Sequence, residues 1–227
     1  MVTLSGPEGH HAAAVRRLRA GERADISDGS GTLAECTVVS VSKDTVTLAV
    51  RSVHVVPPPD PRITVVQALP KGERADLAVE LMTEVGVDAI VAWAADRSVT
   101  RWHPDRAQRA LTKWQSTARE SSKQSRRPWI PEVTGPAALP DVVKLSETAS
   151  LTIVLEADAP APLSTLPLPE TGSIVLVVGP EGGITPAERA ALANADATEA
   201  RLGPTVLRTS TAGAAATAVL LTRTGRW

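Results

Sequence analysis

Glu181 is the residue whose surroundings point most clearly to chemistry. It lies in the segment Gly179-Pro180-Glu181-Gly182-Gly183, directly after the apolar run 174–178. Glycine lets the main chain approach a ligand closely, because it has no side chain to keep the ligand away. A carboxylate in such a loop would repel a polyphosphate, but it could face a cationic ligand or accept a weakly acidic proton. The plainer alternative is a tight turn that carries a solvated glutamate.

The residues after this loop predict the start of a helix. Thr185 is a favourable N-cap, Pro186 suits the first helical position, and Glu188 completes a capping box. The apolar run before the loop is typical of a buried strand. A strand, a loop and a helix N-terminus in this order form the kind of corner at which α/β sheets bind ligands.

A second corner of this kind follows. Leu202 and Gly203 end a short strand, and Leu207-Arg208-Thr209 leads into an alanine-rich helix. An ordinary turn at Gly203 and an ordinary helix cap would also explain this pattern. We expect both loops to face one pocket. They lack the glycine spacing of a dinucleotide fingerprint, and the chain has no P-loop motif with its lysine, so neither kind of phosphate site is supported.

The order of the predicted elements indicates an α/β protein with two domains. Apolar and polar residues alternate before residue 56, which predicts a small β-barrel or curled sheet, and the proline-rich segment 57–62 separates this domain, residues 1–56, from a domain over 63–227. Strands and helices alternate in the second domain, as in a mainly parallel sheet. The predicted strands are 24–26, 33–42, 45–56, 63–69, 89–93, 151–156, 173–178 and 199–202, and the predicted helices are 73–85, 103–123, 186–193 and 211–223.

Positive charge is concentrated in one part of the chain, although the formal net charge is only -1. The segment from Arg97 to Arg127 contains nine Lys and Arg residues and only two acidic residues, so its local net charge is +7. Such a segment suits a polyanion, and arginine binds phosphate with a planar fork; a solvated helix face is the alternative. The chain has five Trp but no Phe or Tyr, which argues against a sheet that stacks RNA bases on aromatic rings.

The remaining composition narrows the class of protein. The chain has a single cysteine, Cys36, which excludes an internal disulfide and a cysteine-based metal cluster. No spacing of His10 or His11 with other ligands supports a metal site, so no metal is expected. The sequence has no apolar run long enough to span a bilayer, and its N-terminal segment has charges where a signal peptide would be apolar. A cytoplasmic protein is therefore expected.

The two loops together resemble the motifs of the SPOUT class of RNA methyltransferases, and specifically the family of small-subunit (16S) ribosomal RNA uridine N3-methyltransferases (RsmE). The similarity spans nearly the whole chain, and outside the loops it rests on Gln124-Ser125, Arg127, Ile130-Pro131-Glu132, Glu80, Thr83-Glu84, Gly86-Val87, His11, Val15, Arg17, Gly21 and Asp28-Gly29.

This resemblance implies a PUA-like N-terminal β domain and a catalytic domain with a trefoil knot in its mainly parallel sheet. It implies a homodimer whose interface lies beside the cofactor pocket, and ribosomal RNA, within the small subunit, as the partner. Family members usually carry another strand ahead of the histidine motif. This chain begins almost at that motif, which leaves the completeness of the β domain open.

The resemblance also implies S-adenosylmethionine as the cofactor, bent and held chiefly by main-chain groups. The expected cofactor-binding residues are Leu155, Gly179, Glu181, Gly182, Gly183, Leu202, Gly203, Val206, Leu207 and Thr209. The expected RNA-binding residues are His11, Arg17, Arg19, Arg97, Arg119, Lys123, Gln124, Arg126 and Arg127.

Two residues are candidates for the reaction itself. A uridine N3 must lose its proton, so we expect Glu181 to act as base or orienting acceptor. Arg208 could stabilise the uridine anion; a phosphate clamp or an interface salt bridge is an equal alternative. As competing functions, methylation of a ribose 2′-oxygen, a non-catalytic RNA-binding assembly factor and a generic nucleotide-binding protein stay open.

Overall fold

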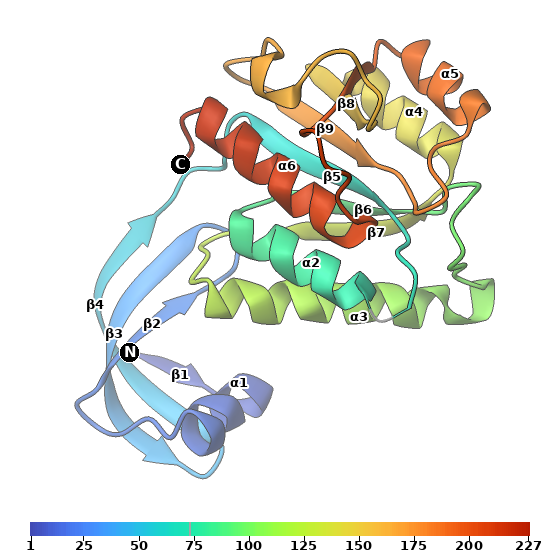
Figure 1. The fold of residues 1–227 in the computed structure, drawn as a ribbon. Helices are drawn as coiled ribbons and strands as arrows, with labels where there is room; N and C mark the ends of the chain where they lie inside the picture. Colours follow the sequence, from blue (N-terminus) through green and yellow to red (C-terminus); the bar gives the residue numbers. More distant parts are fainter. Residues whose placement is uncertain (73) are drawn as a thin grey trace. The chain divides into compact units, whose positions relative to one another are not determined.

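The computed structural model describes residues 1–72 and 74–227, and its contacts divide the chain into two compact units, Met1–Pro58 and Pro59–Trp227 (Figure 1). Glu73, the first residue of the helix predicted over 73–85, lies outside the described residues. The division lies within the proline-rich segment 57–62, and the first strand of the second unit already begins at Arg62.

The first unit is a curled antiparallel sheet with the strand order β1-β4-β3-β2. Its strands are β1 (Val2–Leu4), β2 (Arg23–Ser27), β3 (Thr32–Ser42) and β4 (Thr45–Val55), and a short helix α1 (Gly6–His10) runs on into the π-helical turn η1 (His11–Val15). Alternate residues of β4, such as Val46 and Leu48, are buried, as the period of a half-buried strand predicts. With Ala12, Cys36 and Val38 they form this unit's core.

The start of this unit differs from the sequence-based expectation. β1 was not predicted, yet it pairs with β4 in register from Val2 with Leu48 to Leu4 with Val46. The unit therefore has a strand ahead of His11, where the sequence left one in doubt. Three residues carry too little pattern to be recognised without the partner strand that holds them.

The second unit is a six-stranded parallel sheet between two layers of helices, as expected. The strand order is β10-β8-β9-β5-β6-β7. The strands are β5 (Arg62–Ala68), β6 (Ala89–Trp93), β7 (Glu132–Ala137), β8 (Leu151–Leu155), β9 (Ser173–Val178) and β10 (Thr198–Ala200). The helices are α2 (Arg74–Val85), α3 (Pro104–Gln124), α4 (Leu139–Thr148), α5 (Pro186–Ala193) and α6 (Thr209–Arg223), with a 3-10 turn η2 (Leu163–Thr165).

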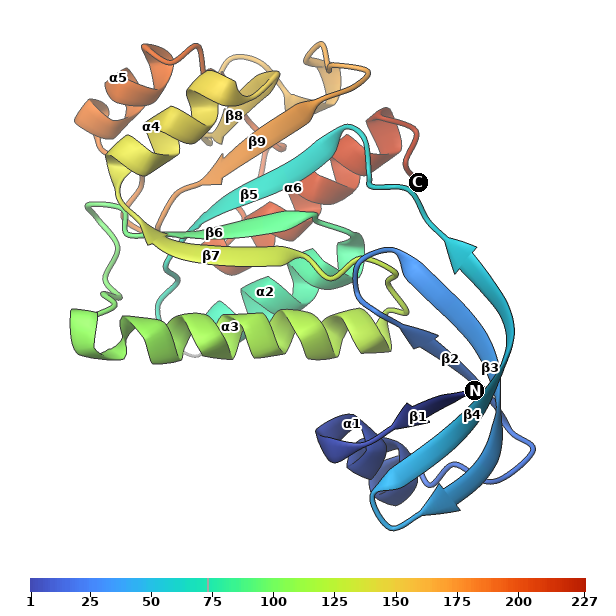
Figure 2. The same cartoon turned by 180° about the vertical axis from the view of Figure 1, so that it is seen from behind.

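Helices cover both faces of this sheet: α2, α3 and α6 lie on one face, and α4 and α5 lie on the other (Figures 1 and 2). A hydrophobic core fills the space between the sheet and each helix layer. The core under α2, α3 and α6 contains Met82, Trp114 and Leu220, and the core under α4 and α5 contains Val142 and Leu192. The central strands β5 and β9 are buried on both faces, which is why they are almost continuously apolar.

Two elements of this unit, β7 and α4, were not predicted. β7 contains Gly135 and Pro136, which are unfavourable in a strand interior, but β7 is the edge strand of the sheet and an edge tolerates proline. In α4, Pro140 lies in the first turn and the Asp141 carboxylate accepts a hydrogen bond from the Ala138 N–H at 2.9 Å. The trefoil knot implied by the resemblance stays a prediction.

Candidate active site

A cavity of about 490 Å³ opens at the carboxyl ends of three adjacent strands. Leu155 ends β8, Val178 ends β9 and Ala200 ends β10, and all three residues line it. Ligands of α/β proteins bind at this edge of a sheet, in cavities of this size. Both predicted loops contribute to the lining, which also includes Gly179, Pro180, Glu181, Gly183, Ile184, Leu202, Gly203, Thr205, Val206, Leu207, Arg208 and Thr209. The expectation that they face one pocket is confirmed.

The loop between β9 and α5 needs glycine at two positions. Gly183 has a φ of +75°, a left-handed conformation that side chains disfavour. A Cβ on Gly182 would lie 3.0 Å from the Arg97 Cβ and 3.2 Å from the Arg97 carbonyl oxygen. Gly182, one of the expected cofactor residues, thus packs against the loop after β6 and is not among the residues that line the cavity.

A buried carboxylate fixes this loop in place. Glu188, only 1% exposed, accepts hydrogen bonds of 2.8 Å from the Thr185 N–H and hydroxyl. The Thr185 hydroxyl oxygen accepts from the Glu188 N–H at 3.2 Å, so the predicted capping box is confirmed. The other Glu188 oxygen accepts from the Asp96 N–H at 2.8 Å. Glu188 therefore joins the start of α5 to the loop after β6.

The second loop, residues 202–208, leaves its main chain available to a ligand. Within the described residues, the N–H groups of Leu202, Gly203, Val206 and Leu207 donate no hydrogen bond to the protein. Val206 is 82% exposed and Leu207 is 40% exposed, although both are apolar. Such a loop can hold a ligand by its backbone and by apolar contact.

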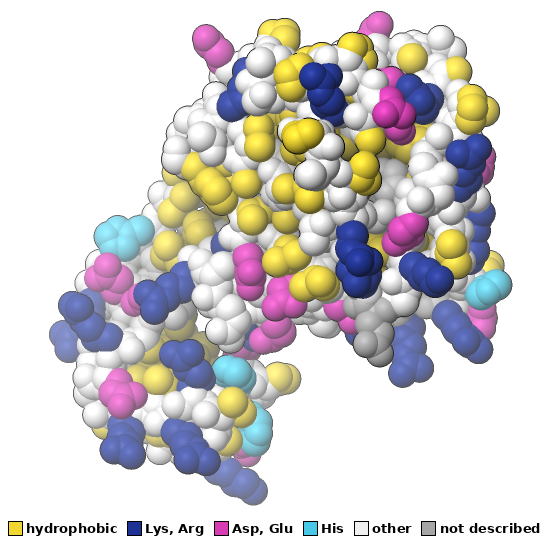
Figure 3. All heavy atoms as spheres, viewed as in Figure 1, with side chains coloured by type: hydrophobic (Ala, Val, Ile, Leu, Met, Phe, Trp, Pro, Cys, Tyr) yellow, Lys and Arg dark blue, Asp and Glu magenta, His cyan; other side chains and the backbone are white. Residues whose placement is uncertain are grey.

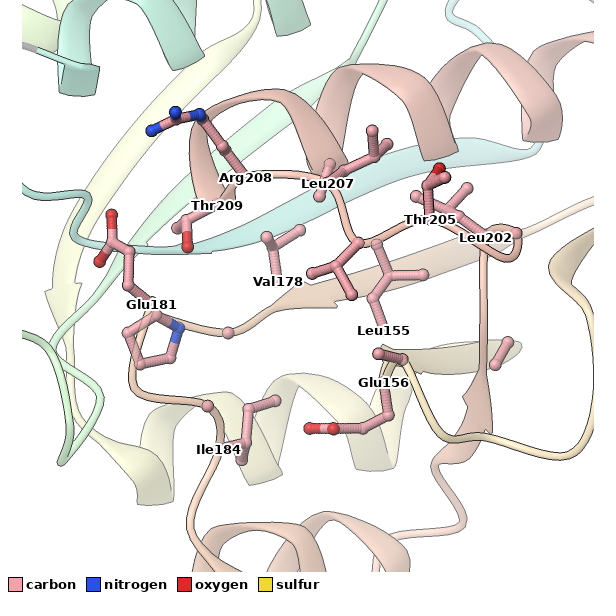
Figure 4. Close-up of a pocket in the computed structure, with 18 of the residues that line it drawn as sticks. Leu155, Glu156, Val178, Glu181, Ile184, Leu202, Thr205, Leu207, Arg208 and Thr209 are labelled. Carbon is pink, nitrogen blue, oxygen red and sulfur yellow. The ribbon is translucent and has the colours of Figure 1, made fainter.

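Glu181 and Arg208, the two predicted reactive residues, both line the cavity (Figure 4). A Glu181 carboxylate oxygen accepts a hydrogen bond of 3.2 Å from the Lys71 N–H. The Glu181 side chain is exposed. Arg208 is the N-cap residue of α6, whose first carbonyl, that of Thr209, accepts from the buried Gln67 amide at 3.2 Å.

Three charged residues of the cavity were not predicted. Lys71 and Arg74 lie before and at the start of α2, and Glu156 directly follows β8. Burial raises the pKa of the Glu156 carboxyl; Glu199 and Asp158 add to the rise and Arg189 opposes it. No motif marks these residues, because each reaches the cavity from a different element; only their position at a strand end or a helix start could have drawn attention to them.

The predicted RNA-binding residues fall into three places. Arg97 lies beside the first loop and donates to the Gly182 carbonyl at 3.2 Å. Arg119, Gln124 and Arg126 are exposed on and just after the C-terminal half of α3, and Lys123, there too, is paired with Glu120 at 2.7 Å. In the space-filling view, Lys and Arg side chains are seen at the lower right, where α3 begins (Figure 3). In the first unit, Arg17 and Arg19 are exposed and His11 is half-buried.

Arg127 lies apart from these residues, and its contact with RNA stays a prediction. Its side chain is 11% exposed, donates to the Thr83 carbonyl at 2.7 Å and lies 3.9 Å from the Asp88 carboxylate. Burial lowers the pKa of Arg127 to about 10. Arg226 forms a two-pronged ion pair with the same carboxylate, at 2.7 and 2.9 Å. The buried Arg127 guanidinium therefore connects separate segments of the chain and does not face the solvent.

Among the described residues, no group of three or more His, Cys, Asp or Glu side chains could hold a metal ion. In the same part of the chain, no helix has the length and apolarity to cross a membrane.

The chain is similar to known proteins over its whole length. The sequence profile of the RNA methyltransferase domain family matches residues 57–221, and that of the RNA methyltransferase PUA domain matches residues 4–51. The ribosomal RNA small subunit methyltransferase E of Mycobacterium bovis is 45% identical over 231 residues, which cover 100% of this chain and 88% of that protein.

Solved structures of such methyltransferases are also similar to this chain in fold. The ribosomal RNA small subunit methyltransferase E of Neisseria gonorrhoeae, bound to S-adenosyl methionine, has a TM-score of 0.85 and 26% identity, and the match covers 98% of this chain and 92% of that one. A Legionella pneumophila protein in complex with the bound cofactor SAM has a TM-score of 0.86 and 27% identity, over 98% and 91% of the two chains.

Proposed function

Because the chain belongs to the RNA methyltransferase domain family, we propose that it transfers a methyl group from S-adenosylmethionine to N3 of a uridine in small-subunit (16S) ribosomal RNA. The observation that carries this proposal is the meeting of two loops, residues 179–184 and 202–209, at one cavity. The loops come from separate parts of the chain and correspond to the cofactor loops of the family.

The residues of the cavity fit this cofactor. Its adenosine part needs apolar walls and main-chain hydrogen bonds. The site offers the side chains of Leu155, Leu202 and Leu207, and the N–H groups of Leu202, Gly203, Val206 and Leu207, which have no acceptor in the described residues. A glycine at 183 keeps side-chain atoms out of the cavity where the backbone turns. The absence of a lysine-bearing phosphate loop is consistent with a ligand that has no phosphate. When bound, the cofactor supplies a sulfonium methyl group as the electrophile.

The protein must then position the uracil and manage the N3 proton. In the proposed mechanism the Glu181 carboxylate faces that N–H and orients it or accepts its proton. The Arg208 guanidinium stabilises the negative charge that develops on the uracil oxygens. Glu181 is exposed in the single chain, so the bound RNA and a second subunit must cover it to keep water away from the reaction.

The RNA is held chiefly through phosphates. Lys71 and Arg74 bring positive charge to the mouth of the cavity, and exposed arginines along α3 extend it. The first unit matches the RNA methyltransferase PUA domain, so we assign Arg17, Arg19 and His11 to RNA contact as well. These contacts should release counterions and make binding sensitive to salt.

The working form is a homodimer in the cytoplasm, where ribosomal RNA is found. The apolar side chains of Val206 and Leu207 are exposed beside the cavity, and a second subunit that covered them would also shield the reaction from water. Sedimentation equilibrium should give twice the chain mass, 23.7 kDa per chain.

Analysis of the methylated nucleoside tests the proposed reaction. The protein is incubated with S-adenosylmethionine and small-subunit ribosomal RNA lacking the modification, and the digested RNA is examined by mass spectrometry. 3-Methyluridine is the expected product. A 2′-O-methylated nucleoside would identify the alternative reaction, and no methylated product at all would contradict the enzyme assignment.

A further inference from the structure

Glu156 is a charged group of the cavity for which the proposed reaction has no use. It directly follows Leu155, the last residue of β8, and lines the cavity with it. Its side chain is half-buried, and within the described residues its carboxylate has no hydrogen-bond or ion-pair partner. A partly buried carboxylate without a partner destabilises the protein. A ligand that donates hydrogen bonds to it would therefore bind favourably.

The distribution of charge around the cavity orients the bound cofactor. Lys71, Arg74 and Arg208 give part of the cavity wall a positive charge that suits RNA, whereas the charged groups near Glu156 are Asp158 and the ion pair of Arg189 with Glu199. Figure 4 shows the Glu156 carboxylate and the Arg208 guanidinium on opposite sides of the cavity, with Val178 between them. The reacting methyl must face the RNA, so the adenosine lies toward Glu156.

We propose that the Glu156 carboxylate accepts hydrogen bonds from the two ribose hydroxyls of the bound S-adenosylmethionine. This inference rests on the proposed function and adds a recognition residue that the loop motifs do not contain. An ionised carboxylate has two oxygens that only accept, and a ribose presents two neighbouring O–H donors. Acidic side chains bind ribose hydroxyls in the same way in dinucleotide sites of α/β proteins.

Asp158 provides a matched control. It lies two residues further along the same loop and is also acidic, but it is exposed and does not line the cavity. A loss of affinity caused only by altered charge on this loop would appear in Asp158→Ala as well as in Glu156→Ala. Glu156→Gln keeps the length of the side chain and one acceptor oxygen, so it should retain part of the affinity that Glu156→Ala loses.

Calorimetric titration of the full chain tests the inference with ligands that separate the contacts. S-adenosylmethionine is compared with 5′-methylthioadenosine, which has the ribose hydroxyls but no ammonium group, and with the 2′,3′-dideoxy form of methylthioadenosine. Glu156→Ala should weaken the first two ligands about ten-fold or more, the usual size of a lost hydrogen bond to a charged group. The same variant should leave the dideoxy ligand unchanged, and Asp158→Ala should leave all three unchanged.

The outcomes separate the two proposals. If the wild-type chain binds S-adenosylmethionine and Glu156→Ala binds it equally well, the inference about Glu156 is overturned and the proposed function stands. A loss of affinity for S-adenosylmethionine but not for methylthioadenosine would also overturn it, because the carboxylate would then be pairing with the ammonium. A wild-type chain that binds none of the ligands would overturn both.

Discussion

Glu188 and Asp96 are 92 residues apart in the chain, and the carboxylate of the first accepts a 2.8 Å hydrogen bond from the N–H of the second. This contact joins the capped start of α5 to the loop after β6, and Arg97 in that loop in turn packs on Gly182. The conformation of the glycine-rich loop is thus set from outside the cavity. Glu188 and Arg97, which hold the loop in this way, are not among the residues that line the cavity.

Glu188→Ala should therefore weaken both the fold and the site. It leaves the N–H groups of Asp96 and Thr185 without their buried acceptor, and the free energy of unfolding should fall by about 2–4 kcal/mol. Urea denaturation measures this change, with the exposed Glu170 replaced in the same way as the control. Equal midpoints for the two variants would show that the contact does not hold the loop.

The buried charge cluster predicts unequal effects for its members. Asp88→Ala removes a carboxylate that faces both Arg127 and Arg226, and uncompensated buried cations cost about 3–5 kcal/mol. Arg127→Met keeps the apolar stem and leaves the ion pair of Asp88 with Arg226, so it should cost about 1 kcal/mol, the value of the lost bond to Thr83. Denaturation of both variants measures the difference. Comparable losses would contradict this division of roles.

Arg126 and Arg127 are neighbours in sequence with opposite surroundings, which makes them a matched pair for RNA binding. Arg126 is exposed, so Arg126→Gln should reduce the slope of log affinity against log salt by about 0.7–0.9. Arg127→Met should leave that slope unchanged, because the side chain is buried against Asp88. Filter-binding titrations over a range of salt concentrations test both. A reduced slope for Arg127→Met would restore it as a phosphate contact.

The role of Glu181 makes a kinetic prediction. Glu181→Gln removes the proton acceptor and keeps the side-chain volume, so turnover should fall about 100-fold or more. The affinity for S-adenosylmethionine should change by less than about two-fold, since the expected cofactor contacts are main-chain groups. Single-turnover methylation and calorimetry measure the two quantities separately. Unchanged turnover would remove Glu181 from the reaction.

The parts of the fold that could be predicted are those whose signals are local. The capping box of Thr185 and Glu188 and the apolar run of β9 are each complete within a few residues. β7 could not be recognised, because Gly135 and Pro136 are tolerated only at the sheet edge that the tertiary structure provides.

In the site, too, only the features with a local sequence signal could be predicted. Both loops could be identified by their glycines and their order, but Glu156 reaches the cavity only through the position of β8. The burial of Arg127 could not be predicted either, because a charge in the sequence does not reveal whether it is buried.

Hydrogen exchange with and without S-adenosylmethionine tests most directly whether the two loops form one cofactor site. We predict that saturating cofactor slows the exchange of main-chain amides in both segments, 179–184 and 202–209, since the bound ligand covers both. Protection confined to one segment, or absent from both, would contradict it.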